Sequence, residues 1–166
     1  MAEIIARIVD IPEKKLVGTR LSMSPANNKT GELWSSFMRK RKMIVNNLSG
    51  DLISMQIYPD NFFDYFNPEN TFEKWAAIEV SDFMALPAGM ETFVLSAGLY
   101  AAFDYKGLST DNWIFQYIFG IWLPKSDYIL DHRPHFEVLG DKYKNNDPNS
   151  EEEIWIPVKH KQELKS

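Results

Sequence analysis

The hydrophobic pattern of the first fifty residues changes from a two-residue to a three- or four-residue period. Residues 3–11 and 15–23 are rich in aliphatic and β-branched side chains and are separated by Pro12 and Glu13, which predicts two strands. Between residues 31 and 48 the apolar positions recur three and four apart. This spacing predicts an amphipathic helix that buries one stripe.

After this helix the pattern returns to that of strands. Residues 52–58 alternate apolar and polar side chains, which is the period of a half-exposed strand. Residues 62–68 form an aromatic segment that reads as a loop or a helical turn, and residues 72–80 read as another strand.

The second half of the chain repeats this order of elements. A strand is expected over residues 90–106 and a helix over 109–123, ending at Pro124, which cannot continue a helix. Strands follow over residues 135–139 and 152–159. Each half therefore reads as strand, helix, strand, strand.

Two such halves predict one α+β domain over residues 1–166, with pseudo-repeats at about 1–82 and 83–160. Side by side, the halves would form one antiparallel sheet with two helices on one face and a central ligand cleft. The duplication rests on the order of elements, since no residue-level repeat accompanies it. We expect the cleft to open on the face opposite the helices, near the pseudo-twofold axis.

Composition excludes several classes of protein. The absence of cysteine rules out disulfides, thiol catalysis and thiolate metal sites. No apolar run approaches the roughly 18 residues that span a bilayer, and no signal-peptide layout is present, so we expect a cytoplasmic protein without a membrane partner. The formal charge of −5 disfavours direct binding of nucleic acid, and the basic run 39–42 reads as a solvated helix surface.

Aromatic residues make up 14% of the chain, more than a core of this size needs, and such residues often line ligand pockets. For each of them, burial in the core is the alternative interpretation. Trp155 is the strongest pocket candidate, because alternation sends Ile154, Ile156 and Val158 to the other face of its strand. The candidates for the pocket wall are Tyr58, Phe66, Trp75, Tyr100, Trp113, Tyr117 and Trp155.

Glu137 is the candidate polar anchor of this pocket. It stands between Phe136 and Val138 in a short predicted strand, so it is either solvated or directed into a groove. In an aromatic cavity, a carboxylate has a raised pKa when no ligand is bound. It attracts a cation or a hydrogen-bond donor, and the aromatic faces add cation–π attraction.

Other catalytic and cofactor sites lack support in the sequence. His132 and His135 have a spacing that converges only on a helix, and Pro134 disfavours a helix there, so we predict no metal site. No nucleophilic-serine motif and no glycine-rich phosphate loop is present, so we expect no cofactor. No residue is assigned as catalytic unless the protein is an enzyme, in which case Glu137 is the candidate.

Four segments of the second half resemble the GyrI-like (gyrase-inhibitor-like) family, which also forms the effector-binding domain of AraC- and MerR-type bacterial transcription activators. These segments are residues 97–107, 122–126, 136–137 and 153–158. The resemblance implies a duplicated fold with a central cleft and a glutamate, here Glu137, that faces cationic or polar aromatic ligands. It also places Trp155 where the family often has an aromatic residue.

A strand beginning near residue 3 would leave no room for a helix-turn-helix domain. We therefore expect a stand-alone protein that binds a small organic molecule. Some relatives look like hydrolases that open strained cyclopropane rings, and in such an enzyme Glu137 would activate water as a general base. A third alternative is a protein-interaction module whose partner is gyrase or a regulator. A closed aromatic pocket would favour the small-molecule binder and the hydrolase over this interaction module.

Overall fold

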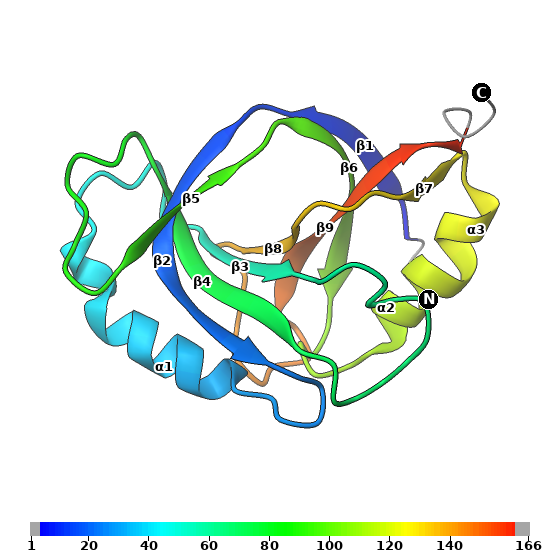
Figure 1. Cartoon of the computed structure of the whole chain (residues 1–166), viewed down its shortest axis with the longest axis horizontal. Helices are drawn as coiled ribbons and strands as arrows, with labels where there is room; N and C mark the ends of the chain where they lie inside the picture. Colours follow the sequence, from blue (N-terminus) through cyan, green and yellow to red (C-terminus); the bar gives the residue numbers. More distant parts are fainter. Residues whose placement is uncertain (1–3, 162–166) are drawn as a thin grey trace.

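The computed structural model describes residues 4–161, and its two halves share the order of two strands, a helical segment and two strands, with the short β7 (Tyr128–Leu130) added in the second half (Figure 1). The first half contains β1 (Ala6–Ile11), β2 (Lys14–Met23), α1 (Thr30–Lys40), the 3₁₀ turn η1 (Arg41–Met43), β3 (Leu52–Ile57) and β4 (Phe72–Val80). The second contains β5 (Glu91–Leu95), β6 (Gly98–Lys106), α2 (Trp113–Tyr117), the π-helical η2 (Ile118–Trp122), α3 (Leu123–Lys125), β7 (Tyr128–Leu130), β8 (His135–Leu139) and β9 (Glu151–His160). The expected start of the first strand at residue 3 lies outside the described residues.

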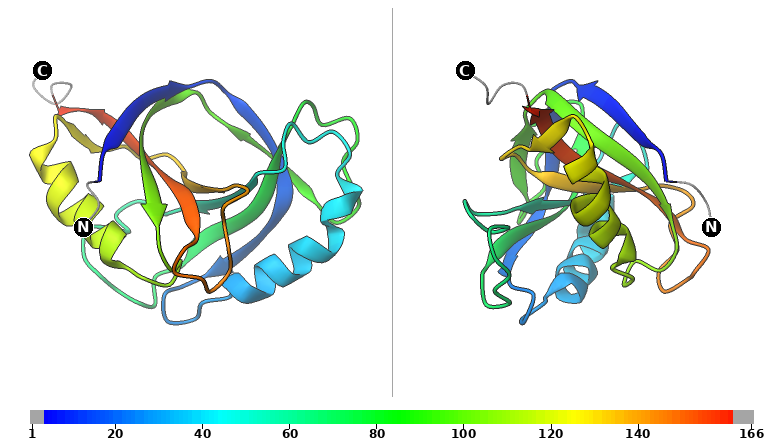
Figure 2. Two further views of the ribbon diagram at one scale, coloured as in Figure 1. Left: turned by 180° about the vertical axis from the view of Figure 1, so that it is seen from behind. Right: turned by 90° about the vertical axis from the view of Figure 1, so that its right-hand side faces the viewer.

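The strands form one antiparallel sheet in the order β1-β6-β9-β8-β3-β4-β2-β5, with the short β7 added to β9. Strand β1 leads directly into β2, and β5 leads directly into β6. Because β1 pairs with β6 and β2 pairs with β5, these two bent ribbons join the ends of the strand order, and the sheet closes on itself. Figure 2 shows from behind how the bent ribbon of β1 and β2 runs beside that of β5 and β6. The α+β class and the single antiparallel sheet with two helical segments are confirmed.

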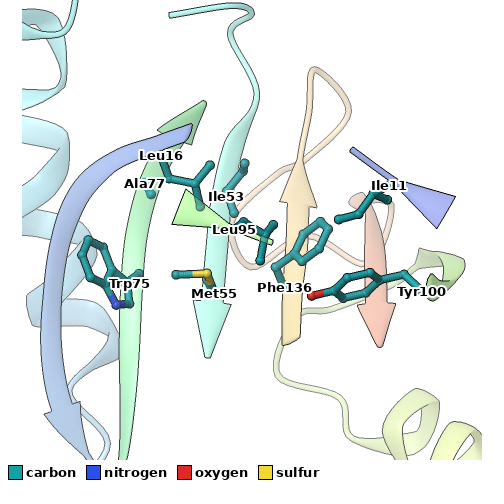
Figure 3. Packing of buried hydrophobic residues seen from close by; sticks show 9 residues of the cluster. All are labelled: Ile11, Leu16, Ile53, Met55, Trp75, Ala77, Leu95, Tyr100 and Phe136. Carbon is teal, nitrogen blue, oxygen red and sulfur yellow. The ribbon is translucent and has the colours of Figure 1, made fainter. Parts of the chain in front are cut away.

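The inner face of this closed sheet is filled by a large apolar cluster (Figure 3). Met55, Tyr100 and Phe136 come from three different strands and are almost fully buried. Burial of this much apolar surface is the main favourable contribution to folding. The inner face is therefore core.

The helices cover the other face of the sheet. α1 packs on β2 and β4, with Leu33 and Phe37 directed into an apolar cluster between them. The second helical segment packs on β6 and β9 through Ile114 and Ile118, which are completely buried. The two halves meet between the helices, where β3 pairs with β8.

The first helix is shorter than the predicted 31–48. It ends at Lys40, η1 continues to Met43, and Ile44 has an extended backbone with φ −82° and ψ 117°. The chain then returns along the end of β4, where the Leu48 amide donates a hydrogen bond to the Glu79 carbonyl at 2.9 Å. The three- and four-residue spacing of apolar residues therefore continues past the end of the helix, into a segment that pairs with β4.

The second helix also differs from the predicted 109–123. It begins at Trp113 and continues beyond Pro124 to Lys125. Within η2 the Leu123 amide bonds to the Ile118 carbonyl, five residues back. Pro124 stands directly after the π-helical η2, near the end of this helical segment. No helix among residues 4–161 is long and apolar enough to span a membrane.

Candidate functional site

A cavity of about 190 Å³ lies at the centre of the helix-bearing face, between the second helical segment and the strands where the two halves meet. Its walls are Gln56, Tyr58, Phe63, Phe72, Lys74, Phe115, Phe119, His135, Phe136, Glu137, Ile154, Trp155 and Ile156. We expected the opening on the opposite face, and the strand register explains the difference. Glu137 is paired with Ser54 and Ile154, and residues paired across strands share a face. Ile154 packs under the second helix, so Glu137 also lies on the helix side.

Glu137 is a half-buried acid in the wall of this cavity. In the described part of the chain no protein donor forms a hydrogen bond to its carboxylate. Burial raises the pKa of Glu137, and the nearby Lys74 ammonium partly opposes this shift. A ligand that donates a hydrogen bond to this carboxylate, or that carries positive charge, would stabilise its charged form.

A group of aromatic rings closes the cavity. The ring of Tyr58 lies 4.7–5.2 Å from those of Phe62, Phe63 and Phe72. Phe63 also stacks on His135 at 5.5 Å and on Phe119 of η2 at 5.6 Å. Since Phe63 is 46% exposed, it forms the outermost layer and joins the β3–β4 loop to the helix above the cavity.

His135 lies beneath these rings and is buried. Burial lowers the pKa of His135 to about 3, with a smaller contribution from His132. Its imidazole is therefore neutral at physiological pH and offers one donor and one acceptor. His132 is exposed instead and pairs with Asp60 at 3.0 Å, so these two histidines have different environments.

A second carboxylate, Glu152, is coupled to Glu137. Burial, with a smaller contribution from the Glu137 charge, raises the pKa of Glu152 to about 7, and Lys74 partly opposes this shift. Glu152 borders a separate hollow of about 470 Å³ whose walls also carry Asp51, Asp104 and Asp141. The walls of this hollow thus carry more acidic than basic side chains, although Lys106 and Lys142 also border it.

Glu137, Tyr58 and Trp155, all predicted as pocket residues, border the cavity. The ring of Trp155, however, stacks on Phe136 at 5.4 Å within the inner cluster. The alternation that separates Trp155 from its aliphatic neighbours also directs its ring away from Glu137.

The remaining predicted aromatic residues do not border this cavity. Trp75 and Tyr100 are core residues of the inner face (Figure 3), and the Tyr100 hydroxyl donates to the Pro134 carbonyl at 2.7 Å. Tyr117 packs in the cluster under the second helix, and Trp113 contacts Tyr105. Phe66 is 82% exposed. Trp75 and Tyr100 are thus buried in the core, and Tyr117 is half-buried against it.

Sequence reasoning missed several residues of the wall. Lys74 had a visible signal, because it is a charged residue within a strand that is otherwise mostly apolar. Gln56 and His135 are polar positions opposite each other on β3 and β8. Phe63 and Phe119 come from a loop and a helix that only the tertiary structure brings together.

Comparison with known proteins gives the family of the chain. Residues 7–158 match the Cass2 family model, described as an integron-associated effector binding protein. The chain is 27% identical over 155 residues to the transcriptional regulator BrlR of Pseudomonas aeruginosa. This match covers 92% of the chain and 55% of BrlR, so the chain spans about half the length of that relative.

Solved structures share the fold. The C-terminal domain of EcmrR superimposes with a TM-score of 0.69 at 18% identity, covering 95% of this chain and 98% of that domain. SAV2435 bound to tetraphenylphosphonium superimposes with a TM-score of 0.67 at 16% identity, covering 93% and 94% of the two chains. The resemblance to GyrI-like effector-binding domains is thereby confirmed, and the chain belongs to the Cass2 family of integron-associated effector-binding proteins.

Proposed function

We propose that this protein binds a small organic molecule in the central cavity, with Glu137 as its polar anchor. The observation that carries the proposal is a carboxylate with a raised pKa in a cavity walled by Tyr58, Phe63 and Phe119. Such an acid destabilises the protein without a ligand, because burying a polar group without a partner is unfavourable. A bound donor or cation would remove this penalty, and the rings would supply dispersion and cation–π attraction.

The family supports the same proposal. Effector binding is the family description, and SAV2435 is a structural neighbour with an aromatic cation bound. The central position between the two halves is also favourable, because sites at such junctions draw groups from both sides. Glu137 and His135 come from one half, and Gln56 and Lys74 from the other.

Calorimetry and thermal shift test this proposal with two probes that fit the cavity, phenylalanine and 2-phenylethylamine. A ligand at a hundred times its dissociation constant should stabilise the wild type by about 2.7 kcal/mol. Glu137→Gln should lose most of this stabilisation, because it removes the charge and keeps the volume. Glu13→Gln is the matched control, since Glu13 is exposed in the turn between β1 and β2. If Glu137→Gln binds as well as the wild type, Glu137 is not the anchor.

Hydrolysis and protein interaction remain alternative predictions. A hydrolase would use Glu137 to activate water, and turnover would appear as continuous heat release and product in the same titration. A module that binds gyrase or a regulator would leave the cavity without a role. In that case neither probe would bind, whatever residue stands at position 137.

A further inference from the structure

Lys74 brings a positive charge into the wall of the same cavity. It lies on β4, paired with Gln56, which is itself paired with His135 on β8. Its side chain therefore points to the helix face, as does that of Glu137. The Lys74 ammonium donates a hydrogen bond to the Thr30 hydroxyl at the start of α1, at 3.2 Å. This contact holds the charge at the cavity rather than in solvent.

Lys74 and Glu137 share the cavity without neutralising each other. Among the ion pairs of residues 4–161, with nitrogen–oxygen distances up to 4.0 Å, none joins these two side chains. Lys74 is nevertheless close enough to lower the pKa of Glu137. The cavity thus presents a carboxylate and an ammonium that are separated by more than a direct contact.

The size of the cavity limits the occupant. At about 190 Å³ it is slightly larger than a cavity of about 150 Å³ that holds benzene and smaller than the roughly 300–1,000 Å³ of drug-sized sites. A molecule with four aryl groups would not fit without displacing the rings of Phe63 and Phe119. A molecule with one or two aromatic rings fits as the cavity stands.

We infer that the ligand is a small amphoteric aromatic molecule, whose donor or cationic group meets Glu137 and whose acceptor or anionic group meets Lys74. The inference rests on the proposed function, that this cavity binds organic molecules, and it specifies the class. The aromatic walls receive the ring, while the two opposite charges on β8 and β4 receive the two polar groups. Lys74 is then a specificity-determining residue.

A ligand with a single charge leaves either Glu137 or Lys74 unpaired, and this difference in pairing would make the cavity selective. A simple aromatic cation pairs with Glu137 but displaces water from the Lys74 ammonium and is repelled by it. A simple aromatic anion has the reverse mismatch with Glu137. Because hydrogen bonds to charged groups are stronger than neutral ones, satisfying both charges should improve affinity by about tenfold or more over satisfying one.

Isothermal titration calorimetry at pH 7.5 tests this with three ligands that share one ring: phenylalanine, 2-phenylethylamine and 3-phenylpropionate. We expect phenylalanine to bind the wild type about tenfold tighter than either of the others. Lys74→Met should weaken phenylalanine and strengthen 2-phenylethylamine, so that the preference disappears. Lys15→Met, at an exposed strand position, is the control and should leave the preference intact.

Two further variants keep the test decisive. Lys74→Gln retains a donor for Thr30 and replaces Lys74→Met if the latter unfolds in a melting experiment. Glu137→Gln should shift the preference toward 3-phenylpropionate. The inference is overturned, and the proposed function stands, if 2-phenylethylamine binds as tightly as phenylalanine and the Lys74 variants change nothing. Both are overturned if none of the three ligands binds the wild type.

Discussion

Replacing Glu137 by glutamine should stabilise the protein when no ligand is present. The carboxylate lies in an aromatic cavity, and within residues 4–161 no protein donor bonds to it. At pH 8 its charged form is therefore unfavourable in the folded state. A buried polar group without a partner costs about 1–3 kcal/mol, and the neutral amide keeps part of this cost, so we expect a gain of about 1–2 kcal/mol.

The pH dependence of this gain identifies its cause. The pKa of Glu137 is raised in the folded state above the ordinary value of 4.5, so the folded protein binds a proton that the unfolded chain has released. Wild-type stability therefore rises as the pH falls from the folded-state pKa toward 4.5. Glu137→Gln has no such proton, and its advantage should shrink over the same interval. Lys74, His135 and Tyr58 border the cavity together with Glu137, and Glu152 is close enough for the Glu137 charge to raise its pKa. Of these groups, Lys74 lowers the pKa of Glu137.

Differential scanning calorimetry from pH 8 to pH 4.5 measures this effect. For a chain of this length 1 kcal/mol shifts Tm by about 2–4 °C, so we expect Glu137→Gln to melt about 2–8 °C higher at pH 8. Glu13→Gln makes the same change of charge at an exposed site and should leave Tm almost unchanged. A variant that is less stable than the wild type, or a gain that is the same at every pH, would refute the argument that the half-buried carboxylate destabilises the folded state.

Three further predictions concern the cavity cap, the core and the basic run. Phe63→Ala uncovers His135, so the pKa of His135 should rise from about 3 toward its ordinary value of 6.5, as measured by NMR titration of the imidazole protons. Ile118→Ala should cost about 2–5 kcal/mol in urea unfolding, because Ile118 is fully buried. Ile121→Ala, three residues further in the same segment but 48% exposed, should cost under about 1 kcal/mol. Residues 39, 40 and 42 of the basic run are exposed, and we expect no salt-sensitive submicromolar DNA binding by fluorescence anisotropy; such binding, lost when these three are replaced, would contradict this.

The hydrophobic periods were sufficient to predict most strands and the order of the elements. Strand β4 was expected over 72–80 and β8 over 135–139, and both were confirmed. These segments could be predicted because strand pairing and burial depend on a local two-residue pattern. The ends of the helices could not, because the apolar spacing continues over residues 44–48, of which 46–48 pair with the end of β4. Local propensity is a weak preference, and tertiary contacts override it.

The sequence by itself also indicated Glu137, through its place between Phe136 and Val138 and the resemblance to GyrI-like proteins, with a solvated strand carboxylate as the alternative. It could not show which face of the sheet Glu137 occupies, since alternation separates two faces without saying which one the helices cover. That depended on the pairing of Glu137 with Ile154 under the second helix. The same pairing directs Trp155 into the inner core, and only the closed sheet brings Lys74 and Phe119 to the cavity from distant parts of the chain. Contacts between residues so far apart in sequence depend on how the halves pack together, which no local pattern records.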